Sequence, residues 1–231
     1  AGLIFILAFG IVAMLFGKLN WEILIYLVLT IASMLTGYLD DASKNPWGEF
    51  KKGALDLLIA CLVAGTYLAF NGSEIFINIL GESIVLNPIV FFILAVILVW
   101  VSINVTNCTD GVDGLSGTLS VITLFTIYLL ESVKGTNSAI NYITLILIVC
   151  VLAYLWFNAT PSKLMMGDAG SRALGIFISI AILKTGSPLL YIPVALMLII
   201  DGGLGLIKIS FRRFLKIEIL NNIRTPIHDQ V

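Results

Sequence analysis

The chain has 231 residues, of which 59% are hydrophobic and 12% are charged, and its mean hydropathy is +1.07. This composition lies far beyond that of a soluble globular domain and indicates a protein that crosses a membrane several times. The net charge of −1 argues against nucleic acid as a partner, because binding a phosphate backbone needs a surplus of lysine and arginine.

Apolar runs separated by polar clusters predict an all-α protein with about seven membrane-spanning helices. Runs of 16 to 20 residues form helices about 24–30 Å long, enough to cross the hydrocarbon core. Helices are expected because a lone strand in lipid would leave its backbone groups unpaired. The predicted spans are residues 1–17, 22–39, 54–70, 88–103, 117–133, 139–157 and 171–207, and a split of the last near residues 186–188 gives an eighth.

Two further segments have patterns of their own. Short apolar runs around Gly81 and Glu82 predict a small hairpin within residues 71–87. Residues 206–220 place aromatic and aliphatic side chains on one helical face and basic side chains on another, which predicts an interfacial helix. No internal repeat or low-complexity segment is evident, so one integral-membrane domain over residues 1–231 is the simplest organisation.

The charged residues predict which side of the membrane each loop faces. If the segments after residues 39, 104, 158 and 205 share one side, that side holds ten lysines and arginines and the other holds three. The positive-inside rule makes the first side cytoplasmic. All eight aspartates lie on or near it, whereas four of the six glutamates lie on the other side. We therefore expect a polar cleft that faces the cytoplasm.

Two polar clusters on this side follow apolar runs. Asp40 and Asp41 end a span, where the negative end of the helix dipole disfavours carboxylates. A solvated loop start is the alternative interpretation of this pair. The second cluster, "NVTNCTDGVDGLSG", places Asp110 and Asp113 on one face if it is helical, and its glycines let a ligand approach the backbone. A turn-rich loop would explain the glycines but not Asn104 and Asn107, which lie one helical turn apart.

Two more clusters lie nearer the end of the chain. Asp168 stands in "GDAGS" directly before a span, a pattern that suits a metal-binding carboxylate beside free backbone N–H groups that attract phosphate. The fourth cluster, "RTPIHDQ", contains the only histidine, His228. A single histidine is more often structural, but His228 lies beside Asp229 on the same side as the three acidic clusters.

Carboxylates without clustered cysteine or histidine indicate a hard cation, and Mg²⁺ fits best. Because Mg²⁺ tends to use one or two carboxylates together with substrate phosphates, the implied substrate is a diphosphate. A transporter is the competing class of protein, but its polar residues would lie near the middle of the membrane. Here Asp201 is the nearest to a mid-span charge. Basic residues expected to offset phosphate charge are Lys44, Lys51, Lys52, Lys163, Arg172 and Arg224.

These motifs, in this order, resemble the polyprenyl-phosphate N-acetylhexosamine-1-phosphate transferase superfamily, and most of all its phospho-N-acetylmuramoyl-pentapeptide transferases. The resemblance covers nearly the whole chain and rests on "LDD", "NVTNCTDGVDGL", "LMMGDAGS" and "TPIHD". It implies a multi-pass enzyme of the bacterial plasma membrane with a cytoplasmic active site. The implied reaction is attack of undecaprenyl phosphate on the β-phosphate of UDP-N-acetylmuramoyl-pentapeptide, with release of UMP and formation of lipid I.

The resemblance also implies roles for individual residues. Asp40 resembles the residue that deprotonates the lipid phosphate, Asp41 its partner near the metal and phosphates, and Asp168 the Mg²⁺ ligand. His228 matches the first residue of the family's histidine motif. The implied substrate-binding residues are Lys44 and either Lys51 or Lys52 at the diphosphate, Asn107 and Asp110 near the nucleotide and metal, and Gly111, Val112, Asp113 and Met165 around uridine.

The chain departs from the family pattern in several places. Two of the family's three consecutive histidines are replaced by Asp229 and Gln230, and Met165 replaces a common phenylalanine. The loop between Asp41 and Lys52 is short, and family members have about ten spans, so N- and C-terminal spans of the family are expected to be missing here. UDP-N-acetylglucosamine is the alternative sugar nucleotide, because the diphosphate motifs are shared. A homodimer is implied by the resemblance only.

Overall fold

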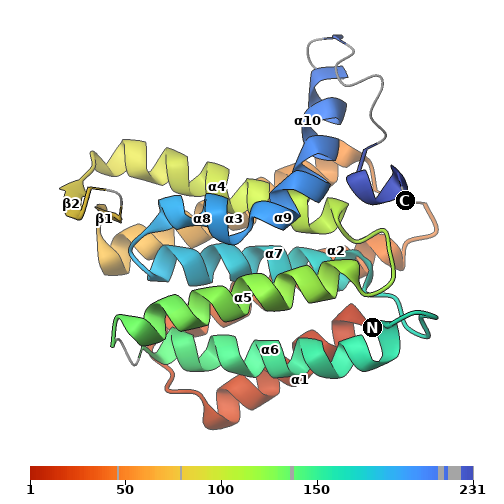
Figure 1. Cartoon of the computed structure of the whole chain (residues 1–231), viewed down its shortest axis with the longest axis horizontal. Helices are drawn as coiled ribbons and strands as arrows, with labels where there is room; N and C mark the ends of the chain where they lie inside the picture. The colour runs from red at the N-terminus through yellow and green to blue at the C-terminus, as the bar shows by residue number, and fades with distance from the viewer. Residues whose placement is uncertain (46, 79, 136–137, 213–215, 218–224, 231) are drawn as a thin grey trace.

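The computed structural model describes residues 1–45, 47–78, 80–135, 138–212, 216–217 and 225–230. Its main elements are α1 (Gly2–Phe16), α2 (Trp21–Asp41), α3 (Glu49–Asn71), β1 (Glu74–Ile77), β2 (Glu82–Val85), α4 (Pro88–Cys108), α5 (Leu115–Val133), α6 (Ala139–Asn158) and α7 (Gly167–Lys184). A broken segment follows, with the turn η1 (Pro188–Leu190), α8 (Tyr191–Val194), α9 (Leu196–Leu198), the π-helical turn η2 (Ile199–Gly203) and α10 (Leu204–Ser210); the last described turn is η4 (Ile227–Gln230). Figure 1 shows the long helices lying side by side.

Local sequence signals set several of the helix starts. The Asn20 side chain accepts a hydrogen bond from the Ile23 N–H at 2.8 Å, and the Ser138 hydroxyl accepts one from the Asn141 N–H at 3.3 Å. At the start of α4, the Asn87 side chain accepts from the Ile89 N–H while Pro88 occupies the first helical position. These side chains satisfy N–H groups that have no partner within the helix, so the polar residue before each apolar run fixes where the span begins.

Helix α7 runs through the middle of the bundle (Figure 1) and is buried from Ala169 to Leu183. Glycines let its neighbours approach closely. A Cβ atom added to Gly175 would lie 2.6 Å from the Ser102 carbonyl oxygen on α4, and one added to Gly37 on α2 would lie 2.5 Å from the Asp168 carbonyl carbon. Small residues at such contacts are typical of helix packing in membranes. They bring the ends of α2 and α4 against the start of α7.

The helices confirm the predicted all-α class. By length and composition, α2 to α6 could each cross a membrane, and residues Pro188–Val194 with Leu196–Lys208 form a further apolar pair bent by 67°. The first predicted span is the shorter apolar helix α1. The predicted span 171–207 comprises α7 and the bent pair, with the break at the predicted residues 186–188. Helix α7 has Asp168, Arg172 and Lys184 near its ends, so it is less apolar than its neighbours.

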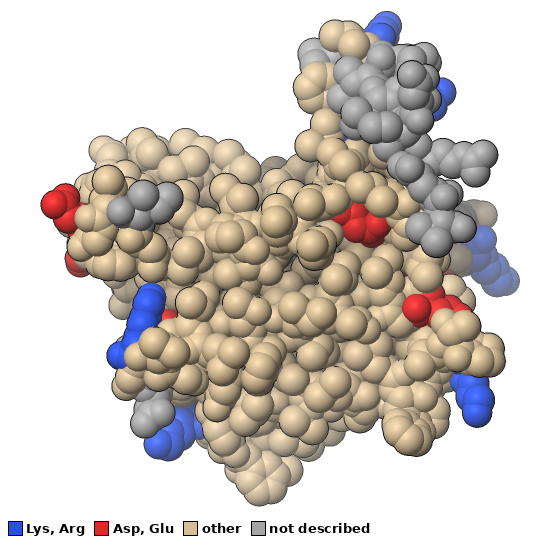
Figure 2. Space-filling model, viewed as in Figure 1, with Lys and Arg blue, Asp and Glu red and all other residues tan. Residues whose placement is uncertain are grey.

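The outer surface of the bundle is rich in apolar side chains. In Figure 2 the charged side chains on this face gather mainly at the two ends of the long helices and around α10. Leu58, Ile93 and Leu152 are exposed between those ends, as expected for helices that contact lipid. Trp21 at the start of α2 and Trp156 near the end of α6 are 77% and 84% exposed, and such aromatic residues favour the membrane–water interface.

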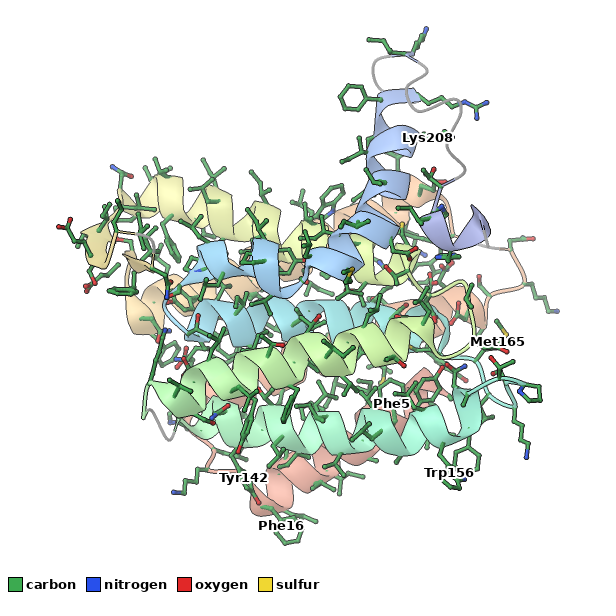
Figure 3. The ribbon with its side chains drawn as sticks, viewed as in Figure 1. Phe5, Phe16, Tyr142, Trp156, Met165 and Lys208 are labelled. Carbon is green, nitrogen blue, oxygen red and sulfur yellow. The ribbon has the colours of Figure 1, made fainter. Side chains whose placement is uncertain are left out.

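The two segments predicted separately have different outcomes. The hairpin is confirmed, because β1 and β2 pair antiparallel with Ile75 opposite Ile84. In the predicted interfacial helix 206–220, α10 covers the start as far as Ser210 and projects from the rest of the molecule (Figures 1 and 3). Residues 213–215 and 218–220 lie outside the described residues, so the interfacial helix stays a prediction.

Candidate functional site

The predicted site residues gather at one end of the bundle, where α2, α4 and α6 end and α7 begins. The antiparallel order of these helices brings together the C-terminal turn of α2, the loop 109–114 after α4 and the loop 159–166 before α7 (Figure 1). The hairpin lies at the opposite end of the molecule. Asp40, Asp41, Asp110, Asp113 and Asp168 belong to these segments or to the start of α7 and thus lie at this end.

Lys52 joins two of the predicted carboxylates. Its ammonium group pairs with Asp40 and lies 3.4 Å from Oδ2 of Asp168. Asp40 is buried, and it also accepts a hydrogen bond from the Trp47 N–H at 2.8 Å. The neighbouring Lys51 instead lies over the Trp47 ring, 3.4 Å from its centroid. Of the two lysines left open by the resemblance, Lys52 is the one at the carboxylates.

Asn107 holds Asp168 from the other side. Its amide nitrogen donates to Oδ1 of Asp168 and contacts the Ser171 hydroxyl oxygen, both at 3.0 Å. The two carboxylate oxygens of Asp168 thus face different partners, Lys52 and Asn107. Asn104, one turn earlier on α4, donates to the Trp100 carbonyl oxygen of its own helix at 2.8 Å. The spacing of the two asparagines therefore does not bring both amides to Asp168.

The first N–H groups of α7 point at carboxylates. The residue before the helix, Met166, supplies no side-chain cap. Instead, the Gly167 N–H faces Asp110, and the N–H groups of Asp168 and Ala169 face Asp41. These carboxylates lie near the positive end of the helix dipole. Phosphate binding by the same N–H groups stays a prediction.

Negative charge accumulates around this helix start. Burial, and after it the charge of the neighbouring Asp168, raise the pKa of Asp110 to about 6, although the Gly167 N–H acts in the opposite direction. Asp41 also lies within the electrostatic influence of Asp168. Like charges held this close disfavour full ionisation unless a cation joins them.

The donor set suits a hard cation. Asp41, Asp110 and Asp168 offer only oxygen donors, which Mg²⁺ prefers. Among the described residues, no three acidic, cysteine or histidine side chains form a ready-made metal cage. Mg²⁺ commonly uses one or two carboxylates and completes its shell with water and substrate phosphates, so this arrangement is compatible with it. The residues therefore fit a metal bound together with its substrate.

Asn158 links the two loops that carry the predicted uridine-binding residues. Its side-chain oxygen accepts from the Gly114 N–H at 2.8 Å, and its amide donates to the Leu164 carbonyl oxygen at 2.9 Å. Asp113 strengthens the link by accepting from the Ser162 N–H at 3.0 Å. Gly114 has a φ of 77°, a left-handed conformation that favours glycine. Sequence reasoning missed Asn158, whose signal was a polar residue at the end of an apolar span.

These links bring Gly111, Val112 and Asp113 to the same end of the molecule as Met165. Val112 and Asp113 are exposed, and Met165 is 77% exposed on its loop (Figure 3). An apolar cavity of about 270 Å³ lies nearby between α1 and α6, but no carboxylate lines it. The cytoplasm-facing cleft therefore stays a prediction.

His228 belongs to a second group beside the carboxylates. Its Nδ1 lies 2.9 Å from Oδ2 of Asp201, and its ring is packed against Gly111. The predicted neighbour Asp229 has a side chain outside the described part. The sequence indicated Asp201 only as an unusual mid-span charge and gave no sign that it pairs with the histidine.

The remaining basic residues have different environments. Arg172 was expected to offset phosphate charge, but this expectation is wrong, because its side chain is buried and pairs with Asp56 of α3. The guanidinium also contacts the Lys52 carbonyl oxygen at 3.4 Å, so Arg172 supports the turn that carries Lys52. Lys44 and Lys163 are exposed on the loops at the site, and Arg224 lies outside the described residues.

The chain is similar to known proteins over its whole length. The model of glycosyl transferase family 4 matches residues 23–186. The chain is 37% identical to the phospho-N-acetylmuramoyl-pentapeptide-transferase of Treponema pallidum (strain Nichols) over 249 residues, which covers 100% of this chain and 69% of that protein. A protein of the same name from Wolbachia pipientis wMel is 25% identical, covering 94% of this chain and 69% of the relative. The chain therefore belongs to glycosyl transferase family 4.

Proposed function

We propose that this chain transfers phospho-N-acetylmuramoyl-pentapeptide from its UDP-activated form to undecaprenyl phosphate in a Mg²⁺-dependent reaction. The observation that carries the proposal is the 37% identity to a transferase of that name over the whole chain. The gathering of Asp40, Lys52, Asn107 and Asp168 at one end of the bundle supports it. Membership of a transferase family favours an enzyme over the transporter considered from composition.

The proposed reaction exchanges one phosphoanhydride bond for another. An oxygen of undecaprenyl phosphate forms a bond to the β-phosphorus of the sugar nucleotide, the bond from that phosphorus to the bridging oxygen breaks, and UMP leaves with that oxygen. Asp168, with Asp41 and Asp110 beside it, would hold Mg²⁺. The ion would supply positive charge to the diphosphate as negative charge develops on the leaving oxygen.

The protein's own residues would bind and orient the two phosphate groups. The Lys52 ammonium lies between Asp40 and Asp168, where it can contact a phosphate without a large movement. Asp40 would accept the proton of the lipid phosphate, and the exposed Lys44 would attract the diphosphate. Asn107 keeps Asp168 in one orientation through its amide.

The position of the site suits substrates that arrive from two phases. Uridine and the sugar would reach Gly111, Val112, Asp113 and Met165 on exposed loops from the aqueous side. The lipid phosphate would arrive along the apolar helix surfaces, at the depth of the interface. Together with the positive-inside rule, this arrangement supports the proposal that the enzyme lies in the bacterial plasma membrane with its site in the cytoplasm.

The test is transfer by the purified full chain in detergent. Undecaprenyl phosphate and Mg²⁺ are supplied with radiolabelled UDP-N-acetylmuramoyl-pentapeptide or radiolabelled UDP-N-acetylglucosamine, and labelled lipid and UMP are measured. We expect both products only from the first sugar nucleotide, and none with a chelator. Transfer from UDP-N-acetylglucosamine instead would move the enzyme to the alternative substrate. Solute movement across liposomes without UMP release would contradict the proposal and favour a transporter.

A further inference from the structure

Asp201 contacts His228 at two nitrogen atoms. The backbone N–H of His228 donates to Oδ1 of Asp201 at 3.0 Å, and ring Nδ1 lies 3.1 Å from Oδ1 and 2.9 Å from Oδ2. Asp201 is 8% exposed, and its side chain lies in a bent, mostly apolar segment. Both carboxylate oxygens are thus directed at one residue that is 27 positions away in the sequence.

This geometry determines which ring nitrogen carries a proton. An ionised carboxylate has only acceptor atoms, so a short contact with Nδ1 requires that Nδ1 be the donor. A carboxylate on Nδ1–H is a recurrent way to fix the tautomer and orientation of an imidazole. In neutral His228, Nε2 is therefore the nitrogen that carries a lone pair.

The other side of the ring lies against the substrate loop. A Cβ atom added to Gly111 would overlap Nε2 of His228, so the ring can reach this position only because residue 111 is glycine. Gly111 directly follows Asp110, whose carboxylate faces the Gly167 N–H at the start of α7. The histidine thus joins the loop that bears the carboxylates, although its motif comes about 60 residues after Asp168.

Asp201 is held firmly enough to orient another side chain. It lies in the π-helical turn η2, and such turns are often found at functional sites. The next residue, Gly202, packs against α4, where an added Cβ would lie 2.6 Å from the Thr109 hydroxyl oxygen and would overlap the Val105 carbonyl oxygen. The same end of α4 carries Asn107, which contacts Asp168. The C-terminal end of α4 therefore contacts both the segment that holds the histidine and the proposed metal-site residue.

We propose that Asp201 is a positioning residue that keeps a proton on Nδ1 of His228 and directs Nε2 toward the substrate bound at the loop 109–114. Nε2 is then the nitrogen that exchanges a hydrogen bond or a proton with the substrate. The part concerning the substrate rests on the proposed function. The tautomer does not, because it follows from the contact with Asp201.

The carboxamide variant tests the pairing directly. Asp201 accepts from two N–H groups of His228, and in Asp201→Asn one of the two oxygens becomes an NH₂ donor. An amide that accepts from the backbone N–H turns its NH₂ group toward Nδ1, which then has to be an acceptor. We expect the neutral imidazole to change from the Nδ1–H to the Nε2–H tautomer, while Asp201→Glu keeps two oxygens and retains Nδ1–H.

The chain has one histidine, so the tautomer can be read without ambiguity. The full chain is labelled with ¹⁵N in its imidazole and studied in detergent at a pH where the ring is neutral. The expected wild-type spectrum has a protonated nitrogen at Nδ1 and an unprotonated one at Nε2. A wild-type Nε2–H tautomer would overturn the proposal, whatever the activity. Absence of transfer by wild-type protein with the expected spectrum would instead count against the proposed function alone.

Kinetics then test whether the tautomer matters. We expect Asp201→Asn to lower kcat by about 10²-fold with little change in KM, within the range of a lost proton-transfer group. Adding His228→Gln to Asp201→Asn should cause no further loss beyond that of His228→Gln alone, since the aspartate acts through the histidine. Glu82→Gln on the exposed strand β2 is the matched control. Independent, multiplicative losses at residues 201 and 228 would overturn the positioning role.

Discussion

The two ends of the helix pair α2 and α7 both carry charged side chains, but they balance the charge differently. At the end near the hairpin, the Lys184 ammonium group of α7 lies 2.9 Å from each carboxylate oxygen of Glu22 on α2. The Asn71 amide and the Tyr26 hydroxyl also donate to Glu22, at 2.6 Å and 3.1 Å. One carboxylate thus meets one ammonium and enough neutral donors to saturate it.

At the other end of the same two helices, the charges do not balance. Asp40 and Asp41 of α2 face Asp168 of α7, Asp110 adds a further carboxylate, and Lys52 is the cation that pairs with this group among the described residues. The first arrangement stabilises the contact between two helices, because every buried charge has its partner. The second leaves an excess of negative charge, which stabilises the fold less but attracts a cation and its phosphate ligands.

The largest effect on activity is expected for Asp168→Asn, at the end with excess negative charge. The amide keeps the shape of the side chain but loses the charge that would hold a hard cation. Because metal stabilisation of phosphoryl charge contributes several kcal/mol, we expect UMP release to fall by at least about 10³-fold. The thermal unfolding midpoint of the variant in detergent should stay close to that of the wild type. Near-normal Mg²⁺-dependent turnover would remove Asp168 from the metal site.

The second test uses two adjacent lysines. Lys52→Met removes the ammonium between Asp40 and Asp168, and we expect turnover to fall by about 10²-fold, as for the loss of one charge-stabilising group. Lys51→Met is the matched control, because Lys51 lies over the Trp47 ring. Its turnover should change by less than about twofold, since surface cation–π contacts contribute little. Equal losses in both variants would mean that the loop needs general positive charge rather than the Lys52 contact.

These lysines also show where sequence reasoning reaches its limit. The apolar runs predicted the helices, and the motifs predicted which polar residues gather at one end, because both depend on local patterns. The choice between Lys51 and Lys52 depends on the rotation of α3 about its axis, which only packing against α2 and α7 decides. The same packing buries Arg172 against Asp56, although its charge alone suggested a phosphate contact.

Contacts between distant residues were the other part that the sequence did not reveal. Asn158 holds Gly114 from 44 positions away, and Asp201 holds His228 from 27 positions away. Neither asparagine nor aspartate has a local pattern that names its partner. Each was visible only as a polar residue within or at the end of an apolar segment. A polar group in such a place is costly when it is unsatisfied, so a partner is expected, but the sequence does not say which residue it is.

A third test addresses the balanced end. Lys184→Met leaves the Glu22 carboxylate with only its neutral donors, and we expect the free energy of unfolding to fall by about 2 kcal/mol, the cost of an incompletely paired buried charge. Adding Glu22→Gln should restore part of that loss. Transfer activity per folded molecule should stay unchanged, because the pair lies at the end opposite to the site. A loss of turnover at unchanged stability would show that this end also takes part in catalysis.

The smallest expected effect comes from two glycines in different halves of α3. An added Cβ at Gly53, next to Lys52, meets nothing within 4 Å, and one at Gly65 would lie 3.9 Å from the Phe92 ring. Alanine therefore fits at both positions, and each substitution should raise the free energy of unfolding by about 0.5–1 kcal/mol, because glycine disfavours a helix interior. If ion pairs rather than backbone flexibility position Lys52, both variants keep wild-type turnover. If turnover falls in Gly53→Ala but not in Gly65→Ala, the start of α3 has to move during the reaction. Lys52, which lies in that part of the helix, would then pair with the excess negative charge during only part of the reaction.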